Sequence, residues 1–408
     1  MAKKMKGSVQ DIVEIDVTKD GDVCNQEELN SLYKQPYFCS ARKAVGLDKL
    51  YILHIDCHWK SNQLAAALSN NSIHLTTTDT LDKISTFIVH EQHIIDIHFN
   101  PVDPNFLFTA SSDGTIRVWD IRNTHQGCVQ EFKDDSDQGI KPFSSFDINC
   151  DGTLLCGGTE KVKNDSYLFV WDTRSPKVLT SYSDFHEDDI SHVQFHHTSP
   201  KMLASCSTDC LINVYDFNQT EEDVLQFCMN TETTCERLQW LNYKKTIKQE
   251  IKQESISVIT NTENVQIWDV EEASPRYSFT REQISEALKR KNAETCFAIR
   301  CFQRGEEKDP LLLAGSSTPN RGCLRMLTMR DGKLEPYAIL YDKKGGNSQL
   351  IRGAVFNQAN GQVVSGGEDG IINVWMPGED KPVTNDSTRK IKTEFSKKKV
   401  VSPSKKPY

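Results

Sequence analysis

The sequence of 408 residues lacks several features that would place it in common functional classes. No run of about 18 consecutive apolar residues occurs, so a membrane-spanning helix is not expected. The first ten residues carry charge but lead into no apolar stretch, so a secretory signal peptide is not expected either. The paired glycines at 157–158 and 366–367 lie in strand-like segments rather than in a phosphate-binding loop. We therefore expect a protein with no cofactor and no membrane association.

The 13 cysteines do not have the spacing of a metal site. Cys206 and Cys210 are separated by three residues rather than two, and no second pair follows them, so no zinc site is expected. The odd count argues against a complete set of disulfides in a large chain without a signal peptide. Reduced and mostly buried thiols are predicted instead.

The chain does contain a repeated pattern of short strands. Each copy has an apolar strand such as 94–99, then a strand of small residues such as 106–111, then a strand such as 115–119 that usually ends in an aromatic residue. Seven copies can be aligned, two of them degraded. Their closing positions are Thr76, Trp119, Trp171, Tyr215, Trp268, Leu327 and Trp375. These positions lie 43 to 59 residues apart, which fits a basic period of about 40–45 residues with loop insertions.

The repeats predict an all-β fold, a seven-bladed β-propeller. A four-stranded sheet cannot bury both of its faces alone, whereas radial stacking of seven sheets does so. After Trp375 no alternating apolar strand follows, so we expect residues 36–44 to supply the missing outer strand and close the ring. The expected organisation is a flexible segment at 1–35, the propeller at 36–378 and a disordered basic tail at 379–408.

Fixed side chains in two repeats resemble the WD-repeat family. The matching sets are His90, Thr109, Asp113 and Trp119, and, nearly, His186, Ser205, Asp209 and Tyr215. The resemblance implies a WD40 propeller with a buried relay in each set, in which the indole bonds the hydroxyl, the hydroxyl bonds His, and His bonds Asp. Trp171, Trp268 and Trp375 occupy the same aromatic position in other repeats. The tyrosine at 215 puts the relay of its repeat in question.

Two motifs carry functional information beyond the fold. Trp119-Asp120-Ile121-Arg122 and Trp171-Asp172-Thr173-Arg174 both have the form Trp-Asp-x-Arg. They resemble the box through which many propellers dock onto the adaptor of the cullin-4 ubiquitin ligase, and Arg122 and Arg174 should then lie exposed on one face. The alternative is that each arginine pairs with Asp120 or Asp172 in its own blade and has little surface to offer.

The function predicted from the sequence is that of a non-enzymatic protein-interaction scaffold in an intracellular complex, located in the nucleus, the cytoplasm or both, with the basic tail favouring the nucleus. The Asp, His and Ser sets that resemble catalytic triads fall at repeat positions and are expected to be structural. Two alternatives stay open: a substrate receptor docked on the cullin-4 adaptor, and an RNA-binding propeller. The net charge of −9 disfavours the RNA-binding alternative. We expect a monomeric propeller within a larger complex.

Two further expectations concern charged segments. Nine Lys and Arg residues among the last 28 residues predict a disordered tail. Its role is left open among a nuclear-import signal, a weak contact with a phosphate backbone and plain solubility. Lys248, Lys252 and Lys392 each lie in an aliphatic-Lys-x-Glu tetrapeptide, the pattern of SUMO acceptor sites. Whether these lysines are modified is left open, because such a tetrapeptide is common by chance.

The insertion between the fifth and sixth repeats has helical character. Residues 280–294 are mostly good helix formers, with Ile284 and Leu288 four apart on one side. Cations at 289–291 would lie at the C-terminal end, where they favour the helix dipole. The sequence predicts a short helix over 281–291.

Overall fold

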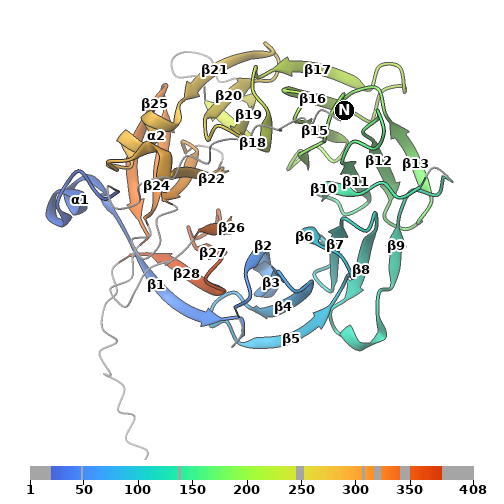
Figure 1. Cartoon of the computed structure of the whole chain (residues 1–408), viewed down its shortest axis with the longest axis horizontal. Helices are drawn as coiled ribbons and strands as arrows, with labels where there is room; N and C mark the ends of the chain where they lie inside the picture. Colours follow the sequence, from blue (N-terminus) through green and yellow to red (C-terminus); the bar gives the residue numbers. More distant parts are fainter. Residues whose placement is uncertain are drawn as a thin grey trace, which may run out of the picture.

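A computed structural model describes residues 20–46, 49–136, 139–244, 252–305, 308–316, 323–340 and 350–378, without the side chains of 243–244 and 252–253. In this part of the chain, 28 strands and two short α-helices form a ring around a central opening (Figure 1). None of the described helices is both long and apolar enough to span a membrane.

The strands form five four-stranded sheets and one eight-stranded sheet. The first sheet contains β2 (Ile52–His58), β3 (Gln63–Leu68), β4 (Ser72–Thr77) and β5 (Lys83–Ile88). The second contains β6 (Ile94–Phe99), β7 (Phe106–Ser111), β8 (Ile116–Asp120) and β9 (Gln130–Phe132). The third contains β10 (Phe143–Ile148), β11 (Leu154–Thr159), β12 (Leu168–Asp172) and β13 (Val178–Tyr182). The fourth contains β14 (His192–Phe195), β15 (Met202–Cys206), β16 (Leu211–Asp216) and β17 (Leu225–Asn230). The fifth is β18 (Cys235–Lys244), β19 (Lys252–Thr260), β20 (Val265–Asp269) and β21 (Ser274–Phe279).

The eight-stranded sheet consists of two four-stranded groups joined through the N-terminal strand. One group is β22 (Cys296–Phe302), β23 (Leu311–Ser316), β24 (Leu324–Arg330) and β25 (Lys333–Ile339); the other is β26 (Ile351–Phe356), β27 (Val363–Gly367), β28 (Ile371–Pro377) and β1 (Gln35–Ala44). Over the described residues the strands thus make seven four-stranded groups, which we call the first to seventh blades, beginning with β2–β5.

Strand β1 closes the ring, as the sequence predicted. It pairs antiparallel with β28, from Tyr37 opposite Pro377 to Ala44 opposite Ile371, and it touches β25 through a short parallel pairing at its start. Figure 1 shows β1 running along the outside of β28. The first and last segments of the propeller therefore share one sheet.

The blades pack against one another through apolar side chains and close backbone contacts. Between the seventh and first blades, Ile52 and Ile55 lie in one buried cluster with Val364 and Val374. A β-carbon on Gly366 would lie 2.8 Å from the Ile55 side chain, so only glycine fits at this position without movement. Close packing of this kind explains the small residues of the second strands.

Residues 20–34, predicted to belong to a flexible segment, are instead folded onto the sixth blade. Helix α1 (Gln26–Leu32) begins with a capping box in which the Asn25 side chain accepts from the Glu28 backbone and Glu28 accepts from the Asn25 backbone. Its Leu29 is buried in one cluster with Ile284. The repeat pattern gave no sign of this segment, because it lies outside the repeats and its stability comes from packing on a distant part of the chain.

A buried set of charged groups anchors the residues before α1. Asp20 is ion-paired with Arg290 and accepts a hydrogen bond from Ser316 at 2.8 Å. Asp22 lies 3.2 Å from Arg290 and 2.8 Å from Arg325. We call these five residues the N-terminal clasp, because they attach the start of the described chain to the loop after α2 and to the sixth blade.

The predicted helix between the fifth and sixth blades is confirmed and is shorter than expected. Helix α2 (Arg281–Ala287) starts from a capping box at Thr280 and Gln283 and packs against β22 and β25. Its last residue is Ala287 and Leu288 is the C-cap, because Lys289 adopts a left-handed backbone conformation, with φ of 60°. The cations beyond 288 therefore follow the helix rather than forming its last turn.

Candidate functional site

The second blade contains the complete polar relay that the WD-repeat resemblance implies. The Trp119 indole on β8 donates to Oγ1 of Thr109 on β7 at 2.9 Å, and Nε2 of His90 lies 2.8 Å from the same oxygen. Nδ1 of His90 lies 2.9 Å from a carboxylate oxygen of Asp113, which sits in the turn between the two strands. Thr109, His90 and Trp119 are all buried, so the relay satisfies groups that water cannot reach.

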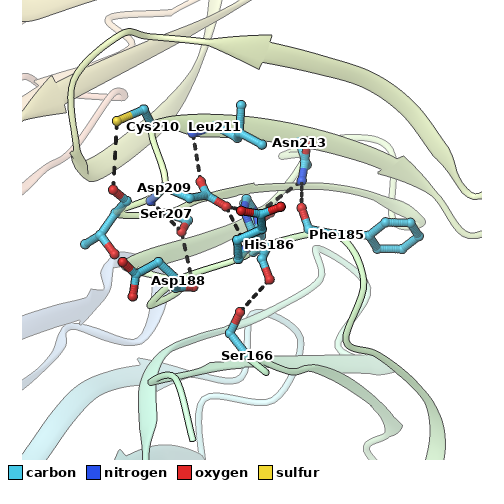
Figure 2. Close-up of polar contacts among 12 residues, drawn as sticks. Ser166, Phe185, His186, Asp188, Ser207, Asp209, Cys210, Leu211 and Asn213 are labelled. Carbon is cyan, nitrogen blue, oxygen red and sulfur yellow. Dashed lines mark hydrogen bonds and ion pairs between the residues drawn. The ribbon is translucent and has the colours of Figure 1, made fainter. Parts of the chain in front are cut away.

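The fourth blade keeps its relay although tyrosine replaces tryptophan, and Figure 2 shows the part of the relay between His186 and Asp209. His186 bonds Asp209 at 3.0 Å and Ser205 at 2.6 Å, and the Tyr215 hydroxyl lies 3.0 Å from the Ser205 hydroxyl. Figure 2 also shows Ser166 of the third blade donating to the His186 carbonyl, at 2.9 Å. The doubt that the sequence raised about Tyr215 is resolved by its phenol oxygen, which takes the place of the indole nitrogen.

In two other blades the indole nitrogen of the tryptophan also has a hydrogen-bond acceptor, at the same strand position in one blade and at another position in the other. In the seventh blade Trp375 donates to Ser365 at 2.9 Å, and Ser365 stands at the position that Thr109 has in the second blade. In the fifth blade Val258 occupies that position and offers no acceptor, so Trp268 donates to Gln266 on its own strand at 2.9 Å. The aromatic position is thus more constant than its hydrogen-bond partner.

In the third blade the indole nitrogen of Trp171 is buried without a partner among the described residues. The strand register places Gly157 where the second blade has its threonine hydroxyl. A β-carbon at Gly157 would lie 2.8 Å from the Phe143 ring, which fills this space. Aromatic packing has therefore replaced the polar relay in this blade.

Replacing Thr109 by valine is expected to destabilise the protein by about 1–3 kcal/mol, because two buried nitrogen groups lose their shared partner while the shape stays nearly constant. Urea denaturation should measure the change in the free energy of unfolding. Thr180→Val, at a half-buried outer-strand position, is the matched control and should change it little. Equal effects of the two variants would contradict a role of the Thr109 hydroxyl in the relay.

The relay also predicts a pH dependence. Burial acts to raise the pKa of Asp113, but hydrogen bonds from His90 and Thr115 outweigh it and lower the pKa to about 2, from an ordinary value of 3.8. Because the folded pKa is the lower one, Asp113 stabilises the protein above about pH 4, and this contribution disappears as the pH falls toward 2. Asp113→Asn should flatten the stability profile between these pH values. A wild-type and a variant profile of equal slope would exclude this contribution.

Each Trp-Asp-x-Arg motif forms a two-bond ion pair within itself. In the second blade Arg122 donates from Nε and Nη2 to the two Asp120 oxygens, at 2.9 and 2.6 Å. In the third blade Arg174 donates in the same way to Asp172, at 2.8 and 2.5 Å, and lowers the pKa of that carboxyl to about 2. The pairing expected from the structural alternative is therefore present in both blades.

The same two arginines are nevertheless exposed. The Arg122 side chain is 62% exposed and the Arg174 side chain 80% exposed, so the expectation that pairing would leave little surface was wrong. The carboxylate bonds the Nε and Nη2 edge of each guanidinium, and most of each side chain stays accessible to solvent. Strands β8 and β12 are the third strands of successive blades and run the same way, so both pairs lie on one face of the ring. We call the face at which first and third strands end the lower face.

The structure shows a third arginine of this kind that the sequence analysis missed. Arg330 follows Leu327 by three residues and therefore stands at the same repeat position in the sixth blade. It pairs with Asp309 rather than with a residue of its own motif, at 2.6 and 2.7 Å, and is 56% exposed. The available signal was the alignment of Leu327 with the tryptophans, since the Trp-Asp letters themselves are absent.

Other predicted positions cannot be placed. Lys248, Lys392 and the whole tail at 379–408 lie outside the described residues. Lys252 begins β19, but its side chain is not described.

Comparisons with known proteins agree with the repeat assignment. The family model for the WD domain, G-beta repeat, matches residues 81–120, 177–216 and 339–376. The chain is 27% identical over 359 residues to the WD repeat-containing protein GTS1 of Arabidopsis thaliana, covering 84% of each. It is 23% identical over 368 residues to the WD repeat-containing protein 89 homolog of Dictyostelium discoideum, covering 88% of this chain and 93% of that protein. A guanine nucleotide-binding protein subunit beta of Saccharomyces cerevisiae is 27% identical over 183 residues, 43% of this chain and 41% of that protein.

Proposed function

Because the chain belongs to the WD-repeat proteins, which generally act as protein-interaction scaffolds, we propose that it is a non-enzymatic scaffold within an intracellular, nuclear complex. A rigid ring with buried polar relays suits this role, since its surfaces keep fixed positions relative to one another. The nuclear part of the proposal depends on the basic composition of the tail.

One observation supports a specific interaction surface, namely the two exposed arginine pairs on the lower face. A guanidinium has five N–H donors, and the aspartate occupies two of them in each pair. The remaining donors face solvent in a fixed orientation, so a partner would lose little entropy in ordering them. Two such groups in adjacent blades offer a partner two separate contacts.

This surface supports a second, more specific function, that of a substrate receptor docked on the cullin-4 adaptor. If so, Arg122→Ala combined with Arg174→Ala should weaken adaptor binding by at least about thirtyfold and so reduce its recovery in co-purification, since even one arginine contact at an interface centre is worth about 2 kcal/mol. Arg330→Ala is the matched control, because it removes an equally paired and exposed arginine from a distant blade.

The outcomes separate the two functions. Loss of adaptor with the double variant and retention with the control would support the receptor function. If the wild-type protein recovers no adaptor, or the double variant recovers as much as the wild type, the receptor function fails and the general scaffold proposal stands. An RNA-binding role is the least supported alternative, because the chain has a net charge of −9.

A further inference from the structure

A cavity of about 590 Å³ opens at the lower-face mouth of the central channel. Residues at or just beyond the ends of the innermost strands of five blades line it, from β2, β6, β10, β14 and β26. Four aromatic side chains contribute to its wall: Trp59, Phe99, Phe195 and Phe356. The cavity lies on the same face as the arginine pairs but contains none of their residues.

The wall also holds two cationic side chains, Lys60 and His98, and the carboxylate of Asp147 forms an ion pair with neither of them. The two oxygens of Asp147 accept backbone hydrogen bonds from Ile148 and Phe195, at 2.8 and 2.7 Å. No Lys, Arg or His nitrogen of the described residues forms an ion pair with it within 4.0 Å. Burial raises the pKa of Asp147 to about 6, although His98 acts in the opposite direction.

The other two carboxylates of the channel wall do have such partners. Asp96 lies 3.4 Å from His54 and 3.6 Å from His98. Asp56 lies 4.0 Å from His98, whose pKa is raised to about 9 because nearby carboxylates, Asp96 foremost, outweigh the effect of burial. Arg300 is also in the channel, but its one described hydrogen bond goes to the Ala354 carbonyl at 3.5 Å. Asp147 is therefore the wall carboxylate left to receive a cation from outside.

We propose that this cavity binds the arginine side chain of a protein partner, with the guanidinium on Asp147 and against the surrounding aromatic rings. Each Asp147 oxygen retains a free lone pair, which permits a two-bond pair with a planar guanidinium. The aromatic faces provide favourable contacts for the same group once it leaves water. This site goes beyond the proposed scaffold function, because it assigns a partner chemistry to a surface that the Trp-Asp-x-Arg motifs do not touch.

Other ligand classes fit this wall less well. An anion would meet the carboxylates of Asp56 and Asp147, and lysine carries a compact, strongly hydrated charge that cannot form the two-bond pair or stack on a ring. No cluster of three or more His, Cys, Asp or Glu residues in the described part of the chain could hold a metal ion. The guanidinium is the group that uses both the carboxylate and the rings.

The test uses the full chain and three probes: acetyl-Gly-Arg-Gly-amide and its Lys and Gln analogues, titrated by isothermal calorimetry and ligand-observed NMR at pH 7.5. We expect the Arg peptide to bind best, the Lys peptide more weakly and the Gln peptide not at all. Asp147→Asn should weaken Arg binding about tenfold, since it removes the charge of the pair. Asp151→Asn, an exposed aspartate of the same hairpin outside the cavity, should leave binding unchanged.

Because Asp147 also holds two backbone amides, thermal melting must show that Asp147→Asn is folded. If it is not, Trp59→Leu provides the second variant and should weaken Arg binding by removing an aromatic wall. The proposal is overturned if the wild type does not bind the Arg peptide, if the Lys or Gln peptide binds equally well, or if the cavity variants bind like the wild type. The Arg122→Ala and Arg174→Ala variant should bind the peptide normally, which keeps this result separate from the adaptor test.

Discussion

Deleting residues 1–44 should abolish cooperative unfolding of the propeller, whereas deleting residues 1–34 should leave a folded ring of lower stability. The longer deletion removes β1, so the seventh blade loses its fourth strand and the outer backbone groups of β28 lose their partners. It also exposes the side of Trp375, which is fully buried in the intact ring. We expect a loss of more than about 5 kcal/mol, comparable with the whole stability of a typical domain.

Circular dichroism melting and size-exclusion chromatography measure this effect. The shorter deletion is the necessary comparison, because it removes α1 and the two aspartates of the N-terminal clasp but retains β1. If both truncated proteins melt at the same temperature with equal cooperativity, ring closure by β1 contributes little and the closed ring is held by the other interfaces.

Asp20→Ala should destabilise the protein by about 3–5 kcal/mol, because it leaves Arg290 buried without its nearest carboxylate. The Asp20 side chain is fully buried and that of Arg290 is 3% exposed, so water cannot replace the lost partner. Asp22 stays 3.2 Å from Arg290 and will offset part of the loss, which favours the lower end of this range.

Chemical denaturation gives the magnitude, and Asp309→Ala provides the control. Asp309 pairs with Arg330 at the surface, where such a pair contributes no more than about 1 kcal/mol. If the two variants lose equal stability, the clasp behaves as a surface ion pair and the segment before α1 is not held by buried charge.

The strands and the closure of the ring could be predicted because their signals are local and repeated. Alternating side chains mark each strand, and the strand missing after Trp375 pointed to the N-terminal residues that replace it. The clasp could not be predicted in this way. Its members Asp22 and Arg325 are 303 positions apart, and nothing in either local sequence marks the other as a partner.

In the candidate site, too, local pairings could be predicted from the sequence and features that depend on distant parts of the chain could not. Pairing of Arg122 with Asp120 was anticipated because the two residues are two positions apart on a strand end. Its exposure was expected only under the rival hypothesis of adaptor docking, and the coexistence of pairing and exposure could not be predicted, since exposure depends on how neighbouring loops lie. The cavity around Asp147 gave no signal in any single repeat, because it exists only where five blades meet.

The pairing of β1 with β28 has a consequence for the folding of the chain while the ribosome synthesises it. Ala44 pairs with Ile371, so the last blade of the nascent chain cannot be completed until 327 further residues have been made. At ordinary elongation rates this is a wait of roughly 15 to 65 s, during which β1 has no partner strand from its own blade. An unpaired strand edge invites association with other chains, and so distant a pairing forms slowly. The strand that completes the propeller is thus an unpaired edge during most of the synthesis of the chain.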